Sequence, residues 1–190
     1  MHPLVVRLPN HLGDVCMSLP ALNALTERFR LCLVGRPWAS ALFHAYEWPV
    51  LPLRGPRWTE CRQLYALRRK AQIDDALLLT NSFSTALHMR LAGLRPRGYA
   101  LDGRSLLLVR AVPAHASRDL HMVPYYHALA TAAFDLPAAP LPKQLGLRLR
   151  ADAHRRARDI LAQAAVGEQP YVLLCPVATG LHRGDRKSVV

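Results

Sequence analysis

Short, fully apolar runs alternate with segments of helical pattern over the first half of the chain, and this alternation constrains the fold more than any other feature. The apolar runs cover residues 4–8, 31–34, 49–53 and 76–79. Leucines and other apolar residues at helical spacing predict helices over 18–29, 37–46, 59–71 and 84–94. Apolar strands separated by helices are typical of a parallel sheet covered on both faces. The sequence therefore predicts an α/β, Rossmann-like parallel sheet with flanking helices.

The second half of the chain is less regular. Residues 98–99 and 106–109 look extended, 121–134 and 152–165 look helical, and the three prolines within 137–142 indicate a linker. One more apolar run, 171–175, precedes a loop rich in Gly, Arg and Thr. A strand without a following helix cannot cover both its faces. We therefore expect one domain over residues 1–166, and the first strand and loop of a truncated second domain over 167–190.

The charge indicates an anionic partner. The chain of 190 residues carries a formal net charge of +12 and has a pI near 10.4, mostly because of arginine. Arginine suits phosphate and carboxylate oxygens, so nucleic acid, a nucleotide-sugar and an acidic lipid all fit. The usual signatures of nucleic-acid binding are absent from the sequence, which has no RNP aromatics and no zinc spacing. A basic nucleic-acid-binding domain and a non-catalytic partner-binding domain remain the alternatives to an enzyme.

Cysteine usage and the amino terminus indicate a compartment. Cys16, Cys32, Cys61 and Cys175 are widely spaced and lie in or beside apolar segments, as is typical of buried thiols in a reducing compartment. The first residues lack the pattern of a signal peptide, and no apolar run approaches the length of a membrane span. We expect a cytoplasmic protein. The nine histidines show no ligand spacing, so no metal site is expected.

The loop after the first apolar run holds the most informative polar residues. Gly13 permits a tight backbone path, and Asp14 follows it where a strand leads into a helix. Asp14 has two interpretations: its carboxylate caps the helix, or it faces the ligand crevice and acts as a general base on a hydroxyl. From the residues alone the cap is favoured. His11 is either solvated or part of a binding site.

A resemblance to a known family bears on this choice. The opening "VVRLPNHLGDVCMSLPALNAL" resembles the amino terminus of glycosyltransferase family 9, the ADP-heptose:lipopolysaccharide heptosyltransferases. Three later stretches are similar to the same family in the same order, namely "DDALLLTNSFSTALHMRLAGLRPRGYALDGRSLLL", "HMVPYYHALA" and "LLCPVATGLHRGDRKSVV". The resemblance spans essentially the whole chain. The family typically continues with Lys-x-Trp-Pro at the last stretch, whereas here Lys187 is followed by Ser188 and two valines.

The resemblance implies the amino-terminal half of a two-domain GT-B enzyme. Such an enzyme transfers a heptose from ADP-heptose to an acidic, lipid-linked saccharide, the inner core of lipopolysaccharide, without a metal or another cofactor. It implies that Asp14 is the general base and that Thr179 and Lys187 contact the donor diphosphate. Gly13 and Gly180 are assigned to the donor side with them. The truncation leaves the activity of this chain open.

Candidate acceptor-binding residues lie in the loops of the predicted sheet. They are Asn10, His11, Asn81, Ser82, Arg97 and Arg104. For Asn81 and Ser82, capping of the next helix is as good an interpretation as acceptor binding. Nearby glycine and turn residues are expected to place Arg97 and Arg104 in loops, where they could bind an acidic group of the acceptor. The basic side chains of the 59–71 helix have two interpretations: they form a solvated face, or they form a surface that binds phosphorylated lipid. Peripheral contact with the inner face of the inner membrane is the corresponding expectation.

Overall fold

The structure is a computed structural model that describes residues 1–114, 120–137, 140–166 and 170–172. The chain divides into two compact units, Met1–Leu149 and Arg150–Val190. The first unit contains the sheet. The second contains one described helix, α7 (Ala151–Gln163).

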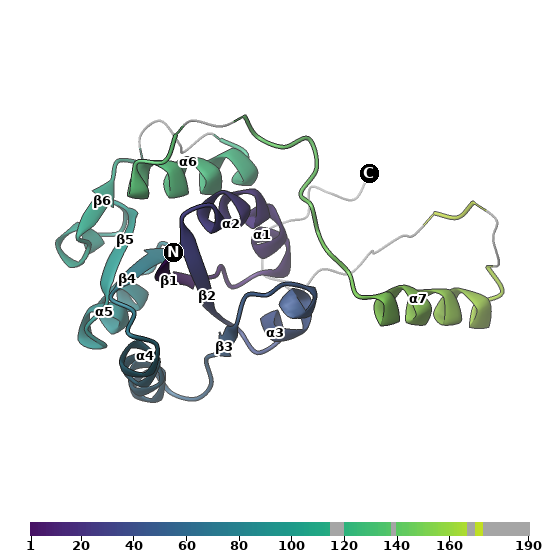
Figure 1. Ribbon diagram of the computed structural model, residues 1–190, viewed down its shortest axis with the longest axis horizontal. Helices are drawn as coiled ribbons and strands as arrows, with labels where there is room; N and C mark the ends of the chain where they lie inside the picture. Colours follow the sequence, from purple (N-terminus) through teal and green to yellow (C-terminus); the bar gives the residue numbers. More distant parts are fainter. Residues whose placement is uncertain (115–119, 138–139, 167–169, 173–190) are drawn as a thin grey trace, which may run out of the picture. The chain divides into compact units, whose positions relative to one another are not determined.

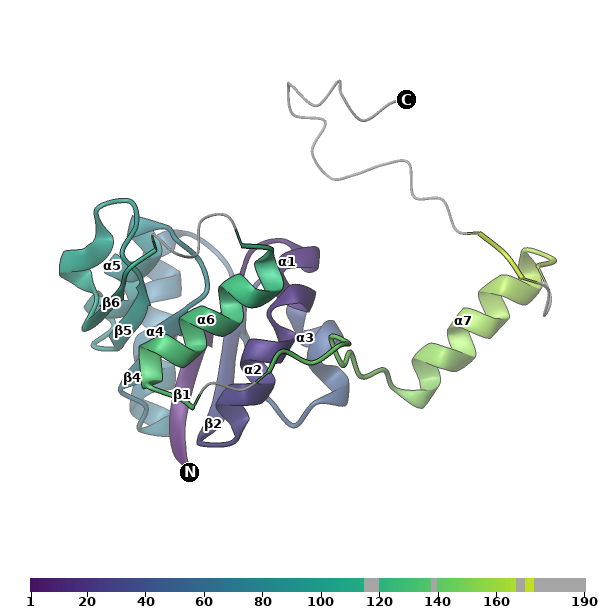
Figure 2. The same cartoon turned by 90° about the horizontal axis from the view of Figure 1, so that it is seen from above.

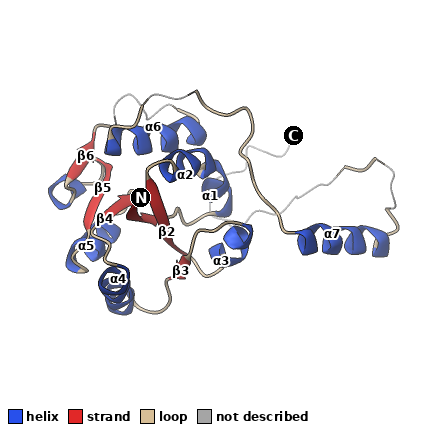
Figure 3. Ribbon diagram, viewed as in Figure 1, coloured by secondary structure: helices blue, strands red, loops and turns tan. Residues whose placement is uncertain are grey.

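Six parallel strands form the sheet of the first unit (Figures 1 and 3). They are β1 (His2–Arg7), β2 (Phe29–Gly35), β3 (Val50–Pro52), β4 (Asp75–Leu78), β5 (Arg95–Tyr99) and β6 (Arg110–Val112). Their order is β3-β2-β1-β4-β5-β6, and every neighbouring pair is parallel. The predicted α/β, Rossmann-like parallel sheet is confirmed.

Helices cover both faces of this sheet. They are α1 (Leu12–Met17), α2 (Leu19–Thr26), α3 (Ala39–Leu42), α4 (Arg57–Ala71), α5 (Phe83–Leu91) and α6 (Met122–Phe134), with the 3-10 turns η1 (Phe43–Ala45) and η2 (Arg104–Leu107). Helices α1, α2 and α6 lie on one face, and α4 and α5 lie on the other (Figures 1 and 2). Both faces need a cover because successive side chains of a strand point to opposite faces of the sheet. In β1, Leu4 and Val6 belong to the core under α2 and α6, whereas Val5 belongs to the core under α4 and α5.

Two local expectations are wrong. Of the predicted extended run over 106–109, the first two residues belong to the turn η2, and the strand β6 begins only at Arg110. Asp102 and Gly103 both have positive φ, 51° and 71°, and this reversal starts the 3-10 turn that Arg104 opens. The predicted helix over 18–29 is preceded by α1, so Gly13 and Asp14 lie in a first helical turn and not in a loop.

A tyrosine attaches the end of the first unit to the sheet. The Tyr46 hydroxyl donates to the carbonyl of Gly146 at 3.1 Å and accepts from the amide of Arg148 at 2.9 Å. The segment after α6, which includes part of the predicted linker, is irregular where the structure describes it. Of the predicted strand over 171–175, Tyr171 and Val172 are described and are unpaired, and the rest lies outside the described residues. No described helix is long and apolar enough to cross a membrane.

The central strand β4 gives a direct test of the sheet core. Leu77 is fully buried, whereas Leu106 on η2 is 95% exposed. We predict that Leu77→Ala lowers the free energy of unfolding by about 2–5 kcal/mol, because it leaves a cavity between the sheet and its helices. Leu106→Ala, the matched control, changes it by less than about 0.5 kcal/mol. Urea unfolding measures both, and equal losses would contradict the described core.

Candidate functional site

The strand order brings three loops together at one edge of the sheet. From β1 the chain moves through β2 to β3, and from β4 it moves the opposite way through β5 to β6. The carboxyl ends of β1 and β4 are therefore neighbours at the point where the winding reverses, which is where open α/β sheets bind ligands. The polar residues after β1, β4 and β5 all belong to this edge.

The loop after β1 is held by a buried arginine. Arg7 is 8% exposed, and its guanidinium donates to the Leu8 carbonyl at 2.8 Å and to Asn10 Oδ1 at 3.2 Å. Burial lowers the pKa of Arg7, and the nearby charge of Glu60 opposes that shift. The candidate Asn10 is thus fixed through its side-chain oxygen. An arginine at the end of an apolar strand is the signal that could have revealed this role.

Asp14 is not used as a helix cap. The residue at the cap position of α1 is His11, which makes no side-chain capping bond, and Asp14 is the third residue of the helix. Within the described part of the chain, the Asp14 carboxylate is half-buried and accepts no hydrogen bond or ion pair. The capping alternative is therefore wrong, and the position in the first turn stabilises the charge through the helix dipole.

Helix α6 lies beside this carboxylate. Burial raises the pKa of Tyr126, and the negative charge of Asp14 raises it further. The Tyr126 ring packs edge-on against Tyr125, with 5.5 Å between the centroids. The half-buried Asp14 carboxylate is therefore close enough to α6 for its charge to act on the Tyr126 hydroxyl. Neither tyrosine was singled out as a site residue from the sequence.

Arg104 ties the loops after β4 and β5 together. It is fully buried, and its guanidinium donates to the Tyr99 carbonyl at 2.9 Å, to the Thr80 carbonyl and to Asn81 Oδ1 at 3.0 Å. Burial lowers the pKa of Arg104. Gly98 leaves the space for this side chain, since a Cβ there would lie 3.2 Å from Arg104 Nη2.

The same network reaches α6 through Asn81. The Asn81 amide donates to the Tyr125 hydroxyl at 2.8 Å, and the Tyr99 hydroxyl donates to the Tyr125 carbonyl at 2.8 Å. Burial raises the pKa of Tyr125, and the hydrogen bond from Asn81 opposes that shift. The structure thus brings the candidates Asn81 and Arg104 together, and they bind each other.

Three further candidates line the solvent side of this edge. His11 and Ser82 are exposed, and Ser82 Oγ lies 2.8 Å from Ser84 Oγ without capping α5. A Cβ built on Gly13 would meet nothing within 4 Å. No atom of the described residues therefore requires a glycine at position 13, and these residues leave the space beside it open to a ligand.

Arg97 does not belong to this edge. The expectation that it lies in a loop is wrong, because it lies within β5. Its guanidinium donates to the Ala133 carbonyl at 2.8 Å, approaches Asp75 Oδ1 at 3.5 Å and stacks on Phe134 at 4.7 Å. These contacts lie at the carboxyl end of α6 and the start of β4. Arg97 attaches α6 to the sheet.

The remaining candidates, Thr179, Gly180 and Lys187, lie outside the described residues. Among the described residues, no group of three or more His, Cys, Asp or Glu side chains is arranged to hold a metal ion.

Comparison with known proteins gives a consistent result. The sequence profile described as glycosyltransferase family 9 (heptosyltransferase) matches residues 62–187. The solved ADP-heptose LPS heptosyltransferase II of E. coli is 26% identical, with a TM-score of 0.66 over 84% of this chain and 50% of that chain. No curated protein sequence matches significantly.

Two further solved structures share the fold. E. coli heptosyltransferase WaaC with ADP-2-deoxy-2-fluoro heptose is 18% identical, with a TM-score of 0.63 over 80% of this chain and 56% of that chain. The glycosyl transferase family 9 structure from Veillonella parvula is 13% identical, with a TM-score of 0.65 over 88% of this chain and 50% of that chain. The chain spans about half the length of these solved relatives.

The Arg104 network predicts a large effect of a conservative change. Arg104→Lys removes a planar group that reaches three acceptors, and a single ammonium cannot replace it. We expect the free energy of unfolding to fall by about 3 kcal/mol, because buried acceptors lose their donors. The control Arg110→Lys changes an exposed pair with Asp135 and costs less than about 0.5 kcal/mol. Similar losses in urea unfolding would show that Arg104 is not a structural tie.

Proposed function

Because the chain belongs to glycosyltransferase family 9, we propose that it forms the acceptor side of a heptosyltransferase. The donor is ADP-heptose, and the acceptor is an acidic, lipid-linked saccharide of the inner core of lipopolysaccharide. Residues 1–166 bind the acceptor, and residues 167–190 contribute to the donor site. The solved relatives include heptosyltransferase complexes with ADP and with an ADP-heptose analogue, which supports this choice of donor.

The observation that carries the proposal is the unpaired carboxylate of Asp14 at the switch point of the sheet. No described group competes for its oxygens, and the space beside Gly13 is open. A carboxylate in this state can accept a proton from a bound hydroxyl. A carboxylate that accepted backbone amides would be a poorer base and would be held away from a substrate.

The reaction follows from that position. Asp14 removes the proton from an acceptor hydroxyl, and the oxygen attacks the anomeric carbon of the donor sugar. The bond between that carbon and the diphosphate oxygen breaks, and ADP leaves with the electron pair. Thr179 and Lys187 stabilise the developing negative charge by hydrogen bonding, with Gly13 and Gly180 allowing close approach of the backbone. This chemistry needs no metal ion.

The acceptor candidates divide into two groups. His11 and Ser82 are exposed at the edge and contact the saccharide. The side-chain NH₂ of Asn10, which donates to no described residue, joins them, while its oxygen accepts from Arg7. Asn81 and Arg104 act as positioning residues, because their polar groups are engaged with each other and with Thr80 and Tyr125. The protein works at the cytoplasmic face of the inner membrane, where such an acceptor is exposed.

Replacing the carboxylate tests the proposed base. We predict that Asp14→Asn lowers the rate of ADP release by about 10²–10⁴-fold, because the amide cannot accept the proton. The melting temperature changes little, since the carboxylate makes no hydrogen bond with the described residues and only its small interaction with the helix dipole is lost. The assay uses the longest polypeptide that the reading frame encodes, with ADP-heptose and a lipid-linked acceptor.

Asp135→Asn is the matched control. Asp135 is an exposed carboxylate at the end of α6 with a positive φ that asparagine also adopts. This variant should retain full activity. Undiminished transfer by Asp14→Asn would remove Asp14 from the mechanism.

The donor side has its own test. Lys187→Met removes a cation from the proposed diphosphate site, and we predict that it weakens ADP binding about tenfold or more. Lys143→Met, which removes a lysine far along the chain from that loop, leaves ADP binding unchanged. Isothermal titration with ADP measures both, and equal affinities would separate Lys187 from the donor.

A further inference from the structure

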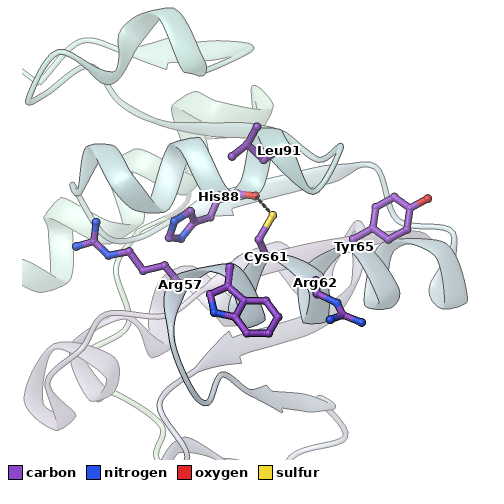
Figure 4. Close-up of a pocket in the computed structure, with 7 residues that line it drawn as sticks. Arg57, Cys61, Arg62, Tyr65, His88 and Leu91 are labelled. Atoms are coloured by element: carbon purple, nitrogen blue, oxygen red, sulfur yellow. Dashed lines mark hydrogen bonds between the residues drawn. The ribbon is translucent and has the colours of Figure 1, made fainter.

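The outer face of α4 and α5 carries a groove that the proposed reaction does not use. A cavity of about 510 Å³ lies between the two helices (Figure 4). Arg57, Arg62 and Tyr65 line it from α4, and Leu91 lines it from α5. Its floor is closed where the Cys61 thiol approaches the His88 carbonyl at 3.8 Å. The groove is therefore a shallow feature of the surface that does not lead into the core.

Large apolar side chains at this groove are exposed to water. Trp58 is 63% exposed, Tyr65 is 51% exposed and Leu91 is 66% exposed. Three such side chains line one groove, and exposed apolar side chains gathered in this way are typical of a surface that contacts another molecule or a membrane. Tryptophan and tyrosine are the side chains enriched at the boundary between lipid and water.

The rim of the same groove is positively charged. Arg57 and Arg62 line the groove from α4 and are exposed, and no carboxylate of the described residues pairs with them. Arg69 and Lys70, exposed further along α4, add positive charge to the helix. The Arg62 guanidinium lies 5.7 Å from the centre of the Trp58 ring, so charge and aromatic surface occur side by side. A basic face next to exposed aromatic and leucine side chains matches an anionic lipid surface.

Two other occupants fit this surface less well. A second copy of the chain would bring the same uncompensated arginines face to face, and like charges oppose that contact. A nucleic acid would satisfy the cations, but it would leave the exposed Leu91 without an apolar partner. An anionic bilayer satisfies both the cations and the apolar side chains.

We propose that the groove between α4 and α5, with its basic rim, docks on the surface of an anionic lipid bilayer. Trp58, Tyr65 and Leu91 enter the headgroup region, and Arg57 and Arg62 bind lipid phosphates. Helix α4 begins directly after β3, so docking there brings the carboxyl edge of the sheet close to the membrane. This inference deepens the proposed function, because a lipid-linked acceptor would be presented at that surface.

Sedimentation with vesicles tests the docking surface. The chain should bind vesicles of phosphatidylcholine mixed with phosphatidylglycerol and should not bind vesicles of phosphatidylcholine alone. The triple variant Trp58→Ser, Tyr65→Ser, Leu91→Ser should lower the partition coefficient tenfold or more. The double variant Arg57→Gln, Arg62→Gln should lower it about fivefold for each charge removed.

Matched variants control for composition and folding. Leu147→Ser with Leu149→Ser removes exposed leucines elsewhere, and Arg28→Gln with Arg30→Gln removes exposed arginines elsewhere. Both should bind vesicles as the unaltered chain does. Melting temperatures establish that every variant is folded.

Several results would overturn the docking proposal. They are the absence of binding to anionic vesicles, equal binding by the groove variants and their controls, and equal binding to neutral vesicles. A dimer that the triple variant abolishes, or an oligonucleotide complex that replaces vesicle binding, would assign the groove to those partners instead.

The docking test is independent of the proposed reaction, because vesicle binding is measured without any sugar donor. Binding without transfer would therefore count against the proposed function alone, and transfer to a detergent-dispersed acceptor without binding would count against docking alone.

Discussion

The buried guanidinium of Arg104 is the interaction on which the edge of the sheet depends. Its bonds to Tyr99, Thr80 and Asn81 join the ends of β4 and β5, and Asn81 extends the connection to Tyr125 on α6. Among the described residues Arg104 has no carboxylate partner, and a buried arginine of this kind is costly unless its donors are satisfied, so all three acceptors must stay in place. The network therefore fixes the loop after β4 in one conformation.

A second buried arginine, Arg7, holds the loop on the other side of the switch point. Arg7 binds the Leu8 carbonyl and Asn10, which sets the path of the chain into α1. Both loops are thus held by hydrogen bonds that do not use Asp14, and the carboxylate remains unpaired within the described part of the chain. Fixed supports around an unpaired carboxylate are what general base catalysis requires, because the base must meet its proton at hydrogen-bond distance.

The sequence predicts the sheet well, because few folds other than a covered parallel sheet bury short apolar runs that alternate with helices. Strands β1, β2 and β4 lie where those runs are. It fails at α1, since Gly13 and the polar residues around it read as loop, and at η2, since Leu106 to Val109 are apolar but Leu106 is exposed. The carboxyl edge is predictable from Asp14 and Asn81. The role of Arg104 is not, because an arginine after Asp-Gly is expected in a loop, where it would bind an acceptor, and only Gly98 opposite it makes room for burial.

The central claim is that the Asp14 carboxylate meets an acceptor hydroxyl. A crystal structure of the protein with a bound lipid-linked saccharide, or a soluble fragment of it, tests this most directly. The account predicts an acceptor hydroxyl within about 2.6–3.2 Å of an Asp14 carboxylate oxygen. An acceptor bound at another edge of the sheet, or an Asp14 side chain turned onto the backbone amides of α1 in the complex, would contradict it.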